Sequence, residues 1–136
     1  MSIEPNRGRR GSKPWASHRK RQAAWRRGQA GELLCLWLLR LKGYRVLARH
    51  FRVAAGEIDL IARRGSHLVA VEVKTRREIA TAIEAVTTRQ RRRIARAFAH
   101  FLRTRPDLAP LTRRFDVMLI TRSPIPVHIK DAWRIN

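Results

Sequence analysis

The sequence predicts an α/β protein in which one helix precedes three consecutive strands, and a second helix and a further strand follow. Residues 57–63 and 68–74 alternate polar and apolar side chains with the period of two that is typical of strands. Residues 20–42 and 88–105 instead repeat apolar side chains at helical spacing. Residues 113–121 are apolar on both faces, as expected for a strand covered by helices.

Length and charge indicate the domain organisation and the kind of partner. The chain has 136 residues, and we expect a flexible basic arm, residues 1–26, before a single domain, residues 27–136. It carries 31 Lys and Arg against 10 Asp and Glu, a net charge of +21, and 26 of the basic residues are Arg. Because the Arg guanidinium binds phosphate through a planar fork, this balance indicates a polyanionic partner, nucleic acid before an anionic membrane. A membrane-surface role is disfavoured because neither predicted helix confines its cations opposite a large apolar face.

Cysteine content and hydropathy exclude several protein classes. Cys35 is the only cysteine, which excludes an intramolecular disulfide and a Cys-based zinc site. The longest apolar run, Leu33–Leu39, has seven residues and is too short to span a bilayer. No apolar segment follows the basic N-terminus, so we expect no secretory signal peptide and a cytoplasmic location. The five His residues are scattered singly, which argues against a His-based metal site.

The basic arm has two interpretations of equal weight. Counted with Arg27, it holds nine basic residues and one acid, and we expect it to be disordered to about Ser17. It would either add phosphate contacts that are independent of base sequence or simply keep the chain soluble. A transit peptide, which is also Arg-rich, ranks below both.

The first helix is expected over about residues 20–42. Gly43 follows the last apolar residue of the pattern and is a natural end for a helix. Residues 44–52 alternate imperfectly and predict the first strand, with both of its faces partly covered. The stripe of the helix expected to face the core consists of Ala30, Leu33, Leu34, Trp37, Leu38 and Leu41.

Residues 56–76 form the predicted central hairpin. Gly65 and Ser66 fit the middle of a type II′ turn, in which Gly comes first. This turn pairs Arg64 with His67, so that the numbers of any two opposed residues sum to 131. The register places three apolar residues of the first hairpin strand on one face, namely Ile58, Leu60 and Ala62.

Two opposed carboxylates distinguish this hairpin. The register sets Asp59 opposite Glu72 and Glu57 opposite Lys74. At about 4 Å the repulsion of two carboxylates is roughly 1 kcal/mol in water and about 4 kcal/mol at an effective dielectric constant of 20. A bound divalent cation, Lys74, or both would offset it. The alternative is a set of ordinary surface acids, but three of only ten acids in the chain lie here.

The second long helix follows a segment, residues 75–87, that is compatible with a loop or a short helical turn. Thr87 or Thr88 is the expected N-cap, and the helix should end before Pro106. Its first turn holds four Arg residues, which oppose the helix dipole at roughly 0.3–1 kcal/mol each. A bound polyphosphate would offset that cost, and a solvated basic turn is the alternative. Residues 127–135 are expected to add an edge strand, with Trp133 closing the core.

An acid on one strand and an acid and a lysine on the next suit metal-assisted phosphodiester hydrolysis. Asp59, Glu72 and the backbone carbonyl of Val73 would hold Mg²⁺, which activates water and polarises the phosphoryl oxygen. Lys74 would orient the water or stabilise charge in the transition state. The strand placement and the acid-poor background make this pattern more specific than Asp…Glu-x-Lys alone.

Six segments of the chain carry a resemblance to a known family. They read G-Q-A-G-E (28–32), G-Y-R-V-L-A-R (43–49), G-E-I-D-L-I-A-R (56–63), V-E-V-K-T-R (71–76), E-A-V-T (84–87) and R-F-D-V (114–117). Over about residues 28–133 the chain resembles the YraN-like bacterial proteins, whose core is similar to archaeal Holliday junction resolvases and restriction endonucleases. The resemblance implies a restriction-endonuclease-like core, a mixed sheet flanked by helices.

The resemblance also implies a set of site residues. It adds Glu32, on the first helix, to the metal ligands and to the catalytic residues Asp59, Glu72 and Lys74, with Mg²⁺ or Mn²⁺ as the cofactor. Gln90 lies where some relatives carry a polar residue that helps to position the site. Resolvase-like relatives act as dimers, which implies a homodimer. The family usually has Lys where Arg89 stands, Asn where His50 stands, and Phe-Gly within the segment 78–82.

Two functions follow from these observations. The first is a Mg²⁺-dependent endonuclease acting on DNA, branched DNA included. The alternative is a nucleic-acid-binding module without catalysis, serving DNA processing or a ribonucleoprotein. In both, the residues expected to contact nucleic acid are Arg76, Arg89, Gln90, Arg91, Arg92 and Arg93.

Overall fold

The computed structural model describes the backbone of residues 14–135 and the side chains of residues 28–135. The chain divides into two compact units, Met1–Ala30 and Gly31–Asn136, and each is described by itself. Helix α1 (Pro14–Leu41) begins in the first unit, at Pro14, which is earlier than the predicted start near residue 20. Proline suits a first helical position because its missing N–H would have no partner there. Of the predicted flexible arm, residues 1–13 lie outside the described residues.

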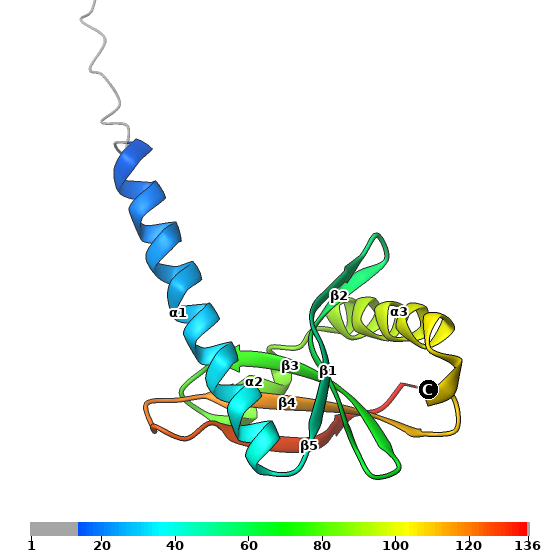
Figure 1. Cartoon of the computed structure of the whole chain (residues 1–136). Coiled ribbons are helices and arrows are strands. Elements are labelled where there is room, and N and C mark those ends of the chain that lie inside the picture. Colours follow the sequence, from blue (N-terminus) through cyan, green and yellow to red (C-terminus); the bar gives the residue numbers. More distant parts are fainter. Residues whose placement is uncertain (1–13, 136) are drawn as a thin grey trace, which may run out of the picture. The chain divides into compact units, whose positions relative to one another are not determined.

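The second unit is an α/β fold built on a five-stranded mixed sheet in the order β1-β2-β3-β4-β5 (Figure 1). The β3–β4 pair is parallel and the other neighbouring pairs are antiparallel. The predicted order of helices and strands is present, with a short helix before the second long one and an edge strand at the end. The remaining elements are β1 (Arg45–Val53), β2 (Gly56–Arg64), β3 (His67–Thr75), α2 (Ile79–Glu84), α3 (Thr88–Thr104), a 3-10 turn (Pro106–Leu108), β4 (Thr112–Ile120) and β5 (Val127–Trp133).

The predicted register of the β2–β3 hairpin is confirmed near its turn. The pairs run from Arg64 opposite His67 to Leu60 opposite Val71. Gly65 has φ +57°, the backbone region that the first central position of a type II′ turn requires.

Beyond Leu60, β2 no longer follows β3 as predicted. The Val73 N–H donates instead to the Asp59 side chain, at 2.9 Å from Oδ2. Ile58 packs in the core cluster that contains α3, whereas Leu60 and Ala62 pack in the cluster that contains α1. The prediction that these three apolar residues share one face was therefore wrong, because β2 turns over at Asp59.

The stripe of α1 predicted to face the core was wrong for most of its residues, although Leu38 does pack against the core. Trp37 and Leu41 are 57% and 84% exposed, and Leu33 and Leu34 are exposed as well. Residues 33–39 are apolar on every side of the helix, so periodicity could not select the face that packs. From residue 28 to the end of α1, the buried side chains are instead Glu32, Cys35, Leu36 and Leu39.

Helix α3 covers the other side of the sheet and is close to its predicted form. Thr87 is the N-cap, and its hydroxyl accepts a hydrogen bond from the Gln90 N–H. The residues of α3 that pack against β1 and β2 are those predicted from the sequence, namely Ile94, Ala97, Phe98, Phe101 and Leu102. In residues 14–135 no helix is both long and apolar enough to cross a membrane.

A buried polar cluster joins β4 to β5. Asp116 is fully buried and accepts two hydrogen bonds from the Arg114 guanidinium, one from His128 Nε2 and one from the Asp131 N–H, all between 2.7 and 2.9 Å. His128 Nδ1 lies 2.6 Å from Lys42 Nζ, which ties the segment after α1 to the same cluster. Burial alone would raise the pKa of Asp116, but these hydrogen bonds hold it below its ordinary value.

Replacing Gly56 should strain the contact between β2 and α3. A Cβ atom on Gly56 would lie 2.0 Å from the backbone oxygen of Arg93, and that atom can move only with the helix. We expect Gly56→Ala to lower the free energy of unfolding by about 1–3 kcal/mol, measured by urea denaturation. Gly28→Ala is the control, since no atom lies within 4 Å of the added Cβ, and it should leave stability unchanged or raise it. Equal stability of Gly56→Ala and wild type would contradict the close approach.

Asp116 should make stability fall in acid. Its pKa is lower in the folded protein than in the unfolded chain, where it is about 3.9. The stabilisation is therefore complete above that pH and disappears as the pH falls through the folded pKa. We expect Asp116→Asn to lose about 3–5 kcal/mol at neutral pH, because Arg114 loses its buried partner, and to lose part of the acid dependence. Urea denaturation across this pH range checks this, and Asp107→Asn, an exposed ion pair, should change little.

Candidate metal centre

Asp59 and Glu72 meet where β2 separates from β3. Asp59 is half-buried on β2, and Glu72 on β3 is 7% exposed. The charge of Asp59 raises the pKa of Glu72, after the larger effect of burial. The Val73 N–H, which would otherwise bond to a backbone carbonyl of β2, donates to Asp59 and fixes its orientation. The carbonyl of Val73 remains a predicted ligand.

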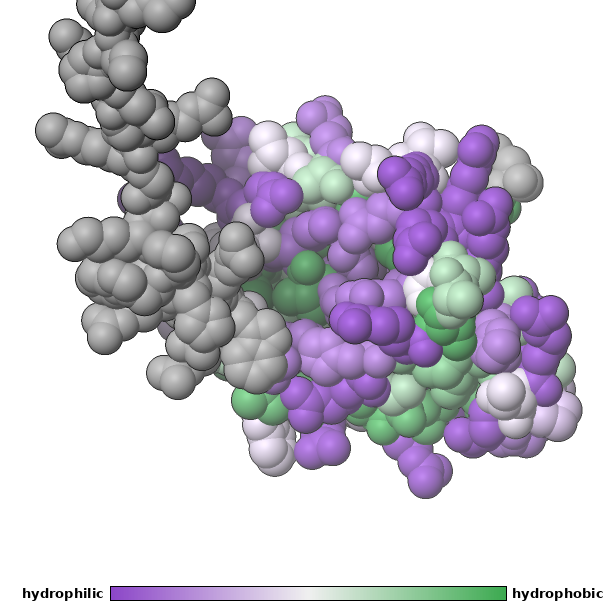
Figure 2. Space-filling model, turned by 90° about the horizontal axis from the view of Figure 1, so that it is seen from above, coloured by the Kyte–Doolittle hydropathy of each residue, from purple (hydrophilic) through white to green (hydrophobic). Residues whose placement is uncertain are grey.

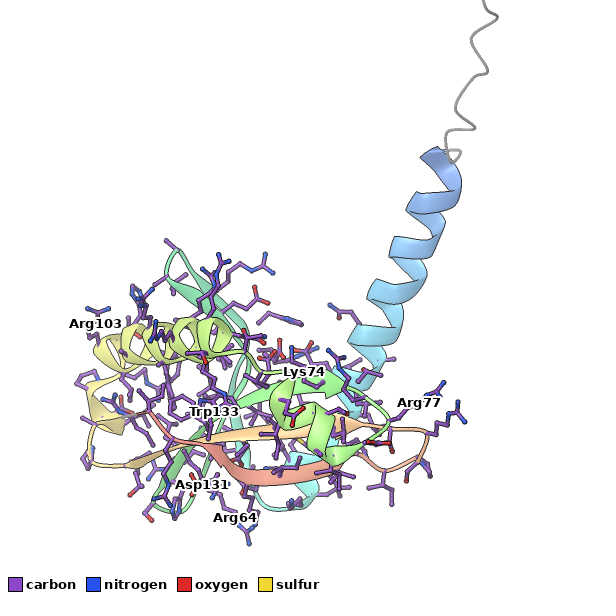
Figure 3. The ribbon with its side chains drawn as sticks, turned by 180° about the vertical axis from the view of Figure 1, so that it is seen from behind. Arg64, Lys74, Arg77, Arg103, Asp131 and Trp133 are labelled. Atoms are coloured by element: carbon purple, nitrogen blue, oxygen red, sulfur yellow. The ribbon has the colours of Figure 1, made fainter. Side chains whose placement is uncertain are left out.

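Lys74 and Gln90 flank Glu72 on the side facing α3. Lys74 Nζ lies 3.4 Å from Glu72 Oε1 and donates to Gln90 Oε1 at 3.2 Å. Gln90 Nε2 donates to Glu72 Oε1 at 2.7 Å. Because Gln90 lies in the first turn of α3 and bonds to the N-cap Thr87, this helix end holds both side chains in place. Figure 3 shows Lys74 on β3, in a view where it lies between Arg77 and Arg103.

Glu32 and His50 complete the cluster on the other side of Asp59. Glu32 is 7% exposed on α1, and His50 Nε2 lies 3.1 Å from Glu32 Oε1. Glu32, His50 and Asp59 each offer a ligand atom, and these atoms all lie within 4.8 Å of one another. The scattered His residues argued against a His-based metal site, but folding brings His50 close to two acids. The sequence carried no signal for it, because the three residues are far apart along the chain.

Burial is the main cause that raises the pKa values of Glu32, Asp59 and Glu72. Burial, followed by the charge of Asp59, raises the pKa of Glu32 to about 7, against a smaller opposing effect of Arg49. Burial also raises the pKa of Asp59, although the Val73 N–H opposes it. Burial and then Asp59 raise the pKa of Glu72, while Lys74 lowers it. A divalent cation among these groups would favour their ionised forms.

The donor set fits a hard divalent cation. Carboxylate oxygens are the ligands that Mg²⁺ and Mn²⁺ prefer. Among the residues with described side chains, none hydrogen-bonds Glu32 Oε1, although this atom is buried. A buried oxygen without a donor is costly, and a cation would satisfy it.

The predicted nucleic-acid contacts separate into two groups. Arg89, Arg92 and Arg93 are exposed on α3, and Arg76 is exposed after β3. Arg91 is half-buried, and its guanidinium donates to the carbonyls of Val86 at 2.9 Å and Ile83 at 3.3 Å. Those bonds hold the turn between α2 and α3, so Arg91 has fewer donors left for a ligand.

A small hollow leads to the carboxylates from the surface. It has a volume of about 120 Å³ and is lined by Glu57, Glu72, Gln90 and Arg93. A larger hollow, about 650 Å³, lies at the opposite ends of β3 and β4, against residues that include His67, Thr112 and Trp133. The larger hollow has no part in the carboxylate cluster.

Figure 2 shows that hydrophilic residues cover most of the described surface on the face it presents.

Comparison with known proteins places the chain in a family. A family model described as "Uncharacterised protein family UPF0102" matches residues 31–120. The chain belongs to this family. It is the YraN-like family that the sequence motifs indicate. The matched residues include all of Glu32, His50, Asp59, Glu72 and Lys74.

UPF0102 relatives align with most of this chain. A UPF0102 protein of Parvibaculum lavamentivorans is 54% identical over 112 residues, which are 82% of this chain and 84% of the relative. One of Paramagnetospirillum magneticum is 49% identical over 122 residues, 87% of this chain and 95% of the relative. One of Azorhizobium caulinodans is 44% identical over 120 residues, 88% of this chain and 92% of the relative. The chain therefore corresponds to nearly the full length of these relatives.

Metal binding should be visible as a change in the melting temperature of this UPF0102 protein. A cation that binds only the folded state stabilises it, by about 2.7 kcal/mol at a concentration 100 times its Kd. We expect saturating Mg²⁺ or Mn²⁺ to raise Tm by several degrees, measured by calorimetry. Glu72→Gln should remove most of the rise caused by Mg²⁺ and should raise Tm without metal, because one buried carboxylate of the pair becomes neutral. Glu78→Gln is the control, because Glu78 is exposed and lies outside the cluster. If metal raised the Tm of both variants equally, the proposed site would be contradicted.

Proposed function

We propose that this UPF0102 protein is a Mg²⁺-dependent endonuclease that hydrolyses DNA phosphodiesters, branched DNA included, and that its core is restriction-endonuclease-like. The observation that carries the proposal is the geometry where the β2–β3 pairing ends: the Val73 N–H donates to Asp59 Oδ2 at 2.9 Å, and Lys74 Nζ lies 3.4 Å from Glu72 Oε1. Buried Glu72 lines the same hollow as Arg93, and Lys74 lies beside Glu72. A bound cation would stabilise the ionised form of this cluster of acids, which stands out in a chain with a net charge of +21.

The proposed chemistry assigns a role to each residue. Asp59 and Glu72 would hold the ion together with Glu32 and the Val73 carbonyl, and bound Mg²⁺ supplies Lewis acidity and a nucleophilic water. Lys74 is placed to stabilise negative charge that develops on the phosphate. Gln90 holds Lys74 and Glu72 in their relative positions and is a positioning residue.

The basic surface supports a nucleic-acid substrate. Arg89, Arg92 and Arg93 are exposed on the first turns of α3, whose N-terminus offers free backbone N–H groups as well. Phosphates lying across this helix end would pass the hollow that Glu72 and Arg93 line. Two copies of the chain, as in the resolvases that it resembles, would place two such sites on a branched substrate.

A nucleic-acid-binding protein without catalysis is the second candidate. The net charge of +21 favours it independently of the acidic cluster. Both candidates bind nucleic acid with strong salt dependence, and only the endonuclease requires Asp59.

The decisive experiment is cleavage of labelled DNA. The substrates are a four-way junction, a flap, a linear duplex and a single strand, each with Mg²⁺, Mn²⁺ or EDTA. We expect metal-dependent cutting, and we expect Asp59→Ala to lower the rate by at least about 100-fold, since changing residues that only support metal ligands already costs 10- to 100-fold. Affinity for DNA in EDTA should be nearly unchanged in the variant.

The matched control is Asp107→Ala. Asp107 is an exposed acid paired with Arg105 on the surface, so this variant should cut like wild type. Cutting by Asp59→Ala at the wild-type rate would reject the proposed active site. Binding of every substrate without cutting, in either metal, would favour the non-catalytic candidate.

Arg93 should contribute one phosphate contact. We expect Arg93→Ala to weaken DNA binding equally for all sequences and to reduce the slope of log K against log salt concentration by about 1. Fluorescence anisotropy over a range of salt concentrations measures both effects. Arg103→Ala, near the other end of α3 in Figure 3, is the comparison and should change the slope less. A larger change of slope in Arg103→Ala than in Arg93→Ala would mean that the nucleic acid does not lie across the N-terminal end of α3.

A further inference from the structure

His50 lies at a break in the regular geometry of β1. Its φ is +48°, a backbone region that side chains rarely adopt, although His, Asn and Asp adopt it more often than others. The register of β1 with β2 pairs Arg49 with Leu60 and Phe51 with Ile58, so His50 and Asp59 are the residues left between these pairs. Unusual backbone of this kind is concentrated at functional sites, where the surroundings hold it. Here it keeps the imidazole 3.1 Å from Glu32.

Glu32 provides an independent observation. Its side chain is 9% exposed, and Oε1 accepts no hydrogen bond from any residue whose side chain is described. The nearby His50 Nε2 does not satisfy it, because the geometry of that pair does not make a hydrogen bond. A buried carboxylate oxygen directed at an imidazole nitrogen and a second carboxylate is suited to share a cation with them.

We propose that Glu32, His50 and Asp59 form a second cation position and that it prefers Mn²⁺ or another transition-metal ion to Mg²⁺. It is distinct from the Asp59–Glu72 position, with Asp59 common to both. The proposal rests on the proposed function only in assigning the first ion to Asp59 and Glu72.

The chemistry of the donors gives the selectivity. Mg²⁺ strongly prefers oxygen ligands, whereas an imidazole nitrogen suits first-row transition metals. Next to Glu72 the ligand atoms are oxygens, and the neighbouring Lys74 is a cation rather than a ligand. Next to Glu32 the nitrogen of His50 is also available as a ligand. A mixed site of this kind would therefore bind the two metals with different affinities at its two positions.

Two ions would also suit the proposed substrate. Three carboxylates, from Glu32, Asp59 and Glu72, do not neutralise two divalent cations, and the remaining positive charge would attract a phosphate. In two-metal sites one ion assists the attacking oxygen and the other the leaving oxygen. An ion pair between Glu32 and a protonated His50 is the competing explanation of their proximity, and it predicts no nitrogen ligand.

The test is Mn²⁺ binding followed by electron paramagnetic resonance, on protein purified without a His tag. We expect wild type to bind two Mn²⁺ per chain and to show ¹⁴N modulation from a bound imidazole in spin-echo spectra. His50→Asn keeps a residue that tolerates positive φ, and it should lose the modulation and weaken one of the two sites by about 10- to 100-fold for Mn²⁺. The affinity for Mg²⁺, measured by competition with Mn²⁺, should change less than the affinity for Mn²⁺ in this variant. His100→Asn, an exposed residue of α3, controls for nonspecific binding to histidine.

A further variant separates this proposal from the proposed function. Glu72→Gln should weaken the first position and keep the ¹⁴N modulation. A wild type that binds Mn²⁺ without ¹⁴N modulation, or a His50→Asn variant that retains it, would overturn the second position, whatever the cleavage assay shows. Modulation that depends on His50 in a protein that cuts no DNA would support the second position and reject the nuclease.

Discussion

The hydrogen bond from the Val73 N–H to Asp59 is the interaction on which the rest of the site depends. It takes the place of a backbone bond between β2 and β3, and β2 turns over at this point. The turn lets Ile58 pack toward α3 while Leu60 stays on the side of α1. It also brings together acids from both sides of the sheet, since Glu32 comes from α1 and Glu72 faces α3.

The chain contains two groups of buried acids with opposite electrostatics. Asp116 is surrounded by donors from its own fold, and its pKa is lowered. Glu32, Asp59 and Glu72 lie near one another with too few donors, and their pKa values are raised. The first group is complete without a ligand and ties β4 to β5. An added cation would stabilise the second group, which is the physical basis for proposing a metal site there.

Helix α3 connects the core, the cluster and the basic surface. Its apolar side packs on β1 and β2, and its cap at Thr87 fixes the position of Gln90. Gln90 then holds Glu72 and Lys74, while Arg92 and Arg93 of the following turn remain exposed. Cations at a helix N-terminus are unfavourable because they oppose the helix dipole. At this end of α3 a bound phosphate would offset that effect.

Local chemistry let the sequence alone determine much of this protein. Strand alternation and the Gly65 turn gave the hairpin register, Thr87 and Pro106 gave the limits of α3, and the scarcity of acids drew attention to Asp59 and Glu72. Tertiary structure alone decided which face of α1 packs, where β2 leaves β3, and that His50 reaches Glu32. An apolar helix segment has no preferred face until a sheet covers it. A contact between residues distant in sequence leaves no periodic pattern, so only the folded chain reveals it.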